Sequence, residues 1–72
     1  MELIRVSIDG EYIKLDSLLK HANLVESGGI AKEIIQEGQV RLNGSLCLQR
    51  GKKIRPKDRV EVGDYVIEVE GD

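Results

Sequence analysis

Between residues 50 and 59 the chain carries a dense run of cationic side chains. Its members are Arg50, Lys52, Lys53, Arg55, Lys57 and Arg59. A cluster of this kind is typical of a patch that binds phosphate groups. Taken alone, it is explained equally well as a solvated loop. The run therefore indicates phosphate binding only if other parts of the chain supply further donors.

A second candidate for anion binding is Ser27-Gly28-Gly29, where the sequence predicts the start of a helix. Serine is a good N-cap, and the free N–H groups and dipole of a helix N-terminus attract anions. The glycines also let a partner come close to the backbone. Lys32 and Gln36 follow Gly28 at spacings of four and eight residues, so they line one edge of the helix. Without those neighbours, a simple capped helix would explain the glycines better.

Other catalytic or metal-binding chemistry has little support. His21 and Cys47 lack partners, because a zinc site needs three or four ligands and a catalytic cysteine needs an oriented histidine. Glu33 and Glu37 lie four residues apart on a predicted helix, where they are most simply a solvated face. We expect no enzyme activity, no catalytic residue, no metal site and no cofactor.

Apolar residues at helical spacing predict two short helices that would position these side chains. The first is predicted over residues 15–23, with Asp16 near its start, from Leu15, Leu18, Leu19 and Ala22. The second begins at Ser27 and is ended by Gly38. Its predicted buried stripe is Ile30, Ala31, Ile34 and Ile35.

Alternating apolar residues predict the strands. The predicted pieces are a strand with Ile4, Val6 and Ile8, a hairpin of 40–48 that turns at Asn43-Gly44, and a terminal hairpin about Gly63-Asp64. Arg41 lies between two apolar residues, so it should face solvent beside the cationic loop. The fold class is α+β, with two packed helices against a small, mostly antiparallel sheet in a single domain of residues 1–72.

The charge is unevenly distributed, although the whole chain has a net charge of only −2. Residues 14–59 hold ten lysines and arginines against five acidic residues, whereas both ends are acidic. Such a local field steers a polyanion. The single cysteine fits a reducing compartment, and we see no signal peptide and no apolar run that spans a membrane. We expect a cytoplasmic protein.

Aromatic residues are scarce, which bears on the kind of nucleic acid. Tyr12 and Tyr65 are the only two, and both are expected to pack at the sheet. Proteins that read single strands commonly stack bases on several aromatic side chains. A folded RNA recognised by the shape of its backbone is therefore favoured over an unpaired strand.

The pattern resembles the S-four (S4) RNA-binding domain family and its αL motif. The resemblance extends over residues 13–62 and is carried by Lys14-Leu15-Asp16, Leu19, Ser27, Ala31-Lys32, Ile35, Gly38, Val40 and Asn43-Gly44. The paired glycines and the Arg50–Lys53 loop are most similar to the small stand-alone bacterial YaaA/YbcJ branch. Many members have arginine at the position of Lys14 and Ser-Arg at Ser27-Gly28. A backbone grip at Gly28 and Gly29, assisted by Lys32, is the substitute that we infer.

The resemblance implies a monomeric domain that binds structured RNA, ribosomal RNA or a ribosome precursor, with ribosomal proteins as further partners and no membrane. The expected RNA-binding residues are Lys14, Ser27, Gly28, Gly29, Lys32, Gln36, Arg41, Asn43, Arg50, Lys52, Lys53 and Arg55. The alternative is an adaptor that docks on a ribosomal protein or an RNA-processing enzyme. The acidic C-terminal segment favours that alternative.

Overall fold

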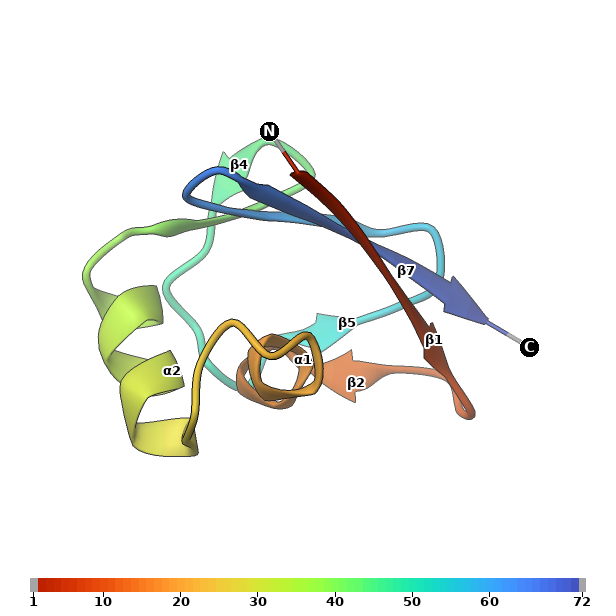
Figure 1. Ribbon diagram of the computed structural model, residues 1–72, viewed down its shortest axis with the longest axis horizontal. Helices are drawn as coiled ribbons and strands as arrows, with labels where there is room; N and C mark the ends of the chain where they lie inside the picture. The colour runs from red at the N-terminus through yellow and green to blue at the C-terminus, as the bar shows by residue number, and fades with distance from the viewer. Residues whose placement is uncertain (1, 72) are drawn as a thin grey trace.

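The computed structural model describes residues 2–71, in which two helices lie on one side of a curved sheet (Figure 1). The elements are β1 (Glu2–Ile8), β2 (Ile13–Lys14), α1 (Leu15–His21), α2 (Gly28–Gln36), β3 (Val40–Leu42), β4 (Ser45–Leu46), β5 (Lys53–Ile54), β6 (Arg59–Val62) and β7 (Tyr65–Gly71). The predicted α+β class is confirmed. Within residues 2–71 no helix has the length and apolar character needed to cross a membrane.

The main sheet has the strand order β1-β7-β6-β3-β4. All of its neighbours are antiparallel except β1 and β7, which run parallel from the pair Glu2 and Tyr65 to the pair Ile8 and Gly71. A separate two-stranded ribbon of β2 and β5 lies on the helical side of this sheet (Figure 1). The predicted mostly antiparallel sheet is therefore confirmed, with one parallel pair that joins the two ends of the chain.

The core lies between the helices and the inner face of the sheet. Its fully buried side chains include Leu15, Leu18, Leu19, Ile35, Val40, Ile54, Val60 and Ile67. Burying such side chains is the main favourable term that a domain of this size possesses. The ribbon takes part, because Ile54 of β5 is fully buried opposite Ile13 of β2.

The prediction that Ile30 belongs to the buried stripe is wrong, since its side chain is 41% exposed. Successive residues lie about 100° apart around a helix. Ala31 and Ile35 point directly into the core, Ile34 is half-buried, and Ile30 lies farthest around the helix from them. The buried face of α2 is therefore narrower at its first turn than the predicted stripe.

The predicted ends of α2 are confirmed. The N–H of Ile30 donates to Ser27 Oγ at 3.3 Å, so Ser27 is the N-cap. At the other end Gly38 has a φ of +81° and its N–H donates to the carbonyl of Ile35 at 3.1 Å. α1 ends at His21, earlier than the predicted residue 23.

The hairpin of β3 and β4 turns at Asn43-Gly44 as predicted. Asn43 and Gly44 have φ values of 51° and 87°, which is the positive-φ pair that a two-residue hairpin loop favours. The strand after the turn is shorter than expected, because β4 is only Ser45–Leu46 and Leu48 lies beyond it. The terminal hairpin of β6 and β7 about Gly63 is confirmed.

Candidate nucleic-acid interface

The cationic loop is fixed to the start of α1 by two backbone hydrogen bonds. The N–H of Leu15 donates to the carbonyl of Lys52 at 2.9 Å, and the N–H of Asp16 donates to the carbonyl of Arg50 at 3.1 Å. The first N–H groups of a helix have no partner within the helix itself. Lys14, at the N-cap position, gives no side-chain cap. The loop carbonyls therefore replace an ordinary cap, and they hold the loop in place.

This arrangement gathers four cations around the ribbon of β2 and β5, which we call the ribbon cluster: Lys14, Arg50, Lys52 and Lys53. Lys14 lies directly opposite Lys53 in the ladder, and both are exposed. Like charges in this position repel and destabilise a strand pair. The Arg50 Nε lies 4.0 Å from Asp16 Oδ2, so a single carboxylate offsets part of the charge. An anion bound beside Lys14 and Lys53 would relieve their repulsion.

Tyr12 stands next to the ribbon cluster and does not pack at the sheet as predicted. It is 41% exposed, and the Lys53 Nζ lies 4.9 Å from the centroid of its ring. A lysine over a tyrosine face is attracted to the ring electrons. The expectation failed because Tyr12 precedes β2 on a connection that leaves the main sheet. Tyr65, the first residue of β7, is likewise exposed.

At the start of α2, the N–H groups of Gly28 and Gly29 have no acceptor within residues 2–71. A Cβ added at Gly28 would meet nothing within 4 Å, and one at Gly29 would meet only Ser27 Oγ at 3.8 Å. Neither glycine has a positive φ. Packing and backbone conformation therefore do not require glycine here, although each costs about 0.5–1 kcal/mol relative to alanine inside a helix. What the pair provides is open access to two free N–H groups.

Lys32 and Gln36 are exposed on α2, in line with Gly28. We call Gly28, Gly29, Lys32 and Gln36 the α2 edge. α1 contacts both α2 and the ribbon, and it lies between them in the helical layer (Figure 1). The ribbon cluster and the α2 edge therefore flank α1, as two donor groups on separate elements.

Arg41 is exposed, as predicted, but it lies apart from these two groups. Its strand neighbours Val40 and Leu42 face the core, so its side chain projects from the opposite face of the sheet. There it lies directly across from Glu61 on β6 and Leu46 on β4. The helical layer covers the other face. The expectation that Arg41 lies beside the cationic loop is therefore wrong.

The side chain of Asn43 is occupied within the protein. Its Nδ2 donates to Asp58 Oδ1 at 3.1 Å, and its Oδ1 accepts from the N–H of Arg59 at 2.9 Å. Asp58 also accepts from the N–H of Arg55 at 2.8 Å. Asn43 thus connects the hairpin turn of β3 and β4 to the turn before β6. The exposed Arg55 side chain extends from that second turn.

Replacing Asn43 with alanine should reduce stability and leave RNA affinity nearly unchanged. The change removes two hydrogen bonds and places alanine at a φ of 51°. The expected loss is about 1–3 kcal/mol, or a decrease of about 5–20 °C in Tm for a domain of this size. Thermal melting followed by circular dichroism measures it. A large loss of RNA affinity in protein that remains folded would return Asn43 to the binding surface.

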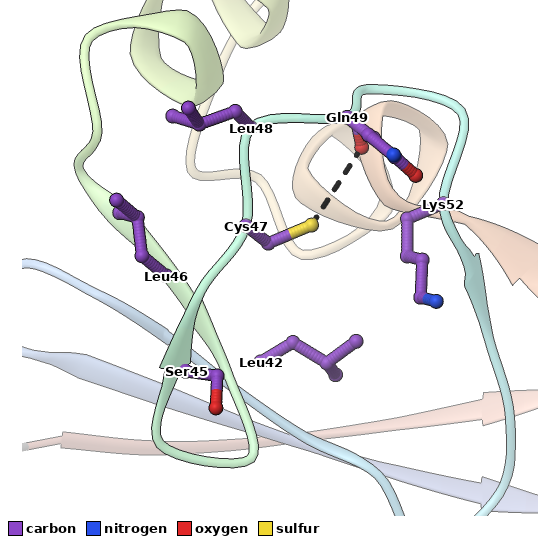
Figure 2. A pocket seen from close by; sticks show the side chains of 7 residues that line it. All are labelled: Leu42, Ser45, Leu46, Cys47, Leu48, Gln49 and Lys52. Atoms are coloured by element: carbon purple, nitrogen blue, oxygen red, sulfur yellow. Dashed lines mark hydrogen bonds between the residues drawn. The ribbon is translucent and has the colours of Figure 1, made fainter.

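A shallow depression of about 400 Å³ lies between the hairpin of β3 and β4 and the cationic loop. Its lining residues are Leu42, Ser45, Leu46, Cys47, Leu48, Gln49 and Lys52 (Figure 2). Cys47 is buried, and its Sγ lies 3.8 Å from the carbonyl oxygen of Gln49. His21 is exposed at the end of α1. In the part of the chain that the structure describes, no three histidine, cysteine or acidic side chains cluster as metal ligands would.

Two helices on one face of a mixed sheet, with cations along the helical layer, define a small α+β domain. The S4 domain family matches residues 6–70, and the chain belongs to that family. It is 41% identical over 66 residues to the "Probable ribosome maturation protein RlbA" of Bacillus subtilis (strain 168), covering 92% of this chain and 83% of that protein.

A second relative is much longer. The chain is 35% identical over 57 residues to the "Ribosomal large subunit pseudouridine synthase B" of Bacillus subtilis (strain 168). The match covers 79% of this chain but only 23% of the synthase. The similarity to the synthase therefore concerns a small part of that enzyme.

Proposed function

We propose that this protein is a non-enzymatic, cytoplasmic RNA-binding module that recognises folded RNA of the ribosome, either ribosomal RNA or a ribosome precursor. The observation that carries the proposal is the capping of α1 by the carbonyls of Arg50 and Lys52, which fixes four cations around the ribbon. Membership of the S4 domain family supports the binding of RNA. The name of the RlbA relative, a probable ribosome maturation protein, supports a ribosomal target.

In this proposal the two donor groups contact phosphates from different strands of a folded RNA. The ribbon cluster supplies charge, with Arg55 at its margin. The α2 edge supplies the free N–H groups of Gly28 and Gly29 together with Lys32 and Gln36. The hydroxyl of Ser27 acts indirectly, because it caps the helix through the N–H of Ile30 and leaves the two glycine N–H groups free.

A folded ribosomal RNA fragment should bind at least about tenfold more tightly than a scrambled sequence of equal length and charge. A folded RNA holds phosphates from separate strands at fixed positions, whereas a flexible strand loses conformational entropy when it reaches both donor groups. Fluorescence anisotropy at matched salt concentration measures the ratio. Equal affinity for the two RNAs would mean general polyanion binding, and the claim of shape recognition would be dropped.

The alternative of a protein-binding adaptor is supported by Leu46 and Leu48, which are 55% and 52% exposed beside the depression of Figure 2. The acidic C-terminal strand supports it less than its composition suggests. Glu68 of β7 lies in register between Arg5 of β1 and Arg59 of β6, and the Arg5 Nε lies 3.8 Å from Glu70 Oε1, so neighbouring cations offset part of the strand's charge. An RNA complex that weakens steeply with salt favours the RNA-binding function. A salt-insensitive complex with a ribosomal protein favours the adaptor.

A further inference from the structure

A second depression, of about 280 Å³, lies beside Tyr12, where β1 turns into β2. Its lining residues are Ser7, Ile8, Asp9, Gly10, Tyr12, Ile13 and His21. They come from the end of β1, the turn after it, the start of β2 and the last residue of α1. Two separate segments of the chain, residues 7–13 and the end of α1, therefore form this depression.

The lining chemistry suits a nucleobase better than a phosphate. Tyr12 and His21 offer flat rings, on which an unpaired base stacks irrespective of its sequence. Asp9 offers a carboxylate that accepts hydrogen bonds from base N–H groups and repels phosphate. Among residues 2–71, no lysine or arginine lines the depression. A base could therefore enter it, while the attached phosphate would have to lie outside.

The ribbon cluster provides a position for this phosphate outside the depression. The Lys53 Nζ lies 4.9 Å from the ring centroid of Tyr12, and Lys14 lies directly opposite Lys53. A single tyrosine thus borders both the depression and the cations. A nucleotide whose base contacts Tyr12 would carry its phosphate toward Lys53. Bases within a continuous duplex are stacked on their neighbours and are not available for this contact.

We infer that Tyr12 and the depression beside it bind one unpaired nucleotide, such as a bulged base, at the edge of the RNA helix held by the ribbon cluster. This inference rests on the proposed function. The surface otherwise recognises only phosphates. The added contact distinguishes an unpaired base from a paired one. The preferred RNA is then a helix interrupted by an unpaired base.

The test uses a hairpin RNA with one bulged nucleotide and the same hairpin without the bulge. The wild-type protein should bind the bulged hairpin about tenfold more tightly, which is within the range measured for one base stacked on an aromatic side chain. Tyr12→Ala should remove that preference and change the affinity for the uninterrupted hairpin by less than about twofold. Tyr12→Phe should keep the preference, because it keeps the ring.

Two further variants separate stacking from other effects. Tyr65→Ala removes the other exposed tyrosine and should keep the preference for the bulge. Gly10→Val should weaken the preference because Gly10 lines the depression, and the change should leave the fold intact because a Cβ at Gly10 meets nothing within 4 Å. In a Tyr65→Phe background Tyr12 is the sole tyrosine, and no tryptophan is present, so tyrosine emission reports on Tyr12 alone. Its emission should be quenched by the bulged hairpin and much less by the uninterrupted one.

The outcomes distinguish this inference from the proposed function. Wild-type protein that binds both hairpins equally, or a Tyr12→Ala variant that loses both equally, would overturn the base-binding site and leave the RNA-binding function standing. Wild-type protein that binds neither hairpin nor a ribosomal RNA fragment would overturn both. If Tyr12→Ala does not fold, Gly10→Val and the quenching measurement decide the question.

Discussion

RNA affinity is expected to fall about 60- to 1,000-fold when monovalent salt is raised from about 50 to about 200 mM. The range corresponds to about four to six phosphate contacts and a log–log slope of about −3 to −5. The cations that the structure offers for these contacts are Lys14, Lys32, Arg50, Lys52, Lys53 and Arg55, all of which are exposed. A titration against a ribosomal RNA fragment at several salt concentrations measures the slope.

Two glutamine variants of the protein, measured in the same titration, test which cations contact the RNA. Lys53→Gln should make the slope less negative by about 0.7–0.9, the change expected for one lost phosphate contact. Arg41→Gln removes a charge of the same sign from the opposite face of the sheet, where Arg41 lies across from Glu61, and should leave the slope unchanged. A wild-type slope near zero would reject electrostatic binding. Equal effects of the two variants would reject the placement of the surface.

Gly29→Asp should weaken RNA binding by about 30-fold or more while the fold remains intact. The carboxylate would stand beside the free N–H groups of the α2 edge, and like charges brought together at an interface cost several kcal/mol. The side chain has room, because a Cβ at Gly29 meets only Ser27 Oγ at 3.8 Å. An acidic residue in the first turn also interacts favourably with the helix dipole. The variant should therefore melt at the same temperature as the wild type or higher.

Gly29→Ala and Glu33→Ala are the matched controls. Gly29→Ala adds a methyl group without charge, so it reports how closely the RNA approaches the backbone. Glu33→Ala removes a charge one turn farther along α2 and should have a much smaller effect than Gly29→Asp. Unchanged RNA affinity for Gly29→Asp, together with an unchanged circular dichroism spectrum, would remove the start of α2 from the binding surface.

Features that depend on a few neighbouring residues were predictable from the sequence. Ser27 and Gly38 mark the two ends of α2, because capping needs only a hydroxyl at one end and a positive φ at the other. Asn43-Gly44 turns the hairpin for an equally local reason. The S4 domain family was also identifiable from such spaced residues.

Features that depend on distant segments were not predictable. The parallel pairing of β1 with β7 joins residues 2–8 to residues 65–71, and no local pattern selects that partner. The ribbon of β2 and β5 has only two residue pairs, too few for any periodicity. Lys53 and Ile54 therefore looked like part of a loop. Their strand character arises from the burial of Ile54 in the core.

The candidate site likewise has some residues that the sequence predicts and others whose placement depends on the fold. Clustering in the sequence identified Arg50, Lys52 and Lys53, since they share one loop. Strand alternation and the family resemblance added Arg41 and Asn43, which the fold places on the opposite face and in an internal hydrogen-bond network. The sequence does not predict a binding role for Tyr12. Its exposure beside Lys53 results from the pairing of β2 with β5, which joins residues far apart in the sequence. Which cations act together is a property of the fold.

The parallel pair of β1 and β7 determines how the domain resists mechanical force. Glu2 and Gly71 lie at opposite ends of this pair, so force applied through these two residues slides one strand along the other (Figure 1). In this shear geometry the load is shared by the whole seven-residue ladder, whereas an antiparallel terminal pair would unzip one bond at a time. Resistance to forced unfolding is governed by the unfolding rate, which can be slow even when equilibrium stability is modest. A small domain with a marginal core can thus resist being pulled apart through Glu2 and Gly71.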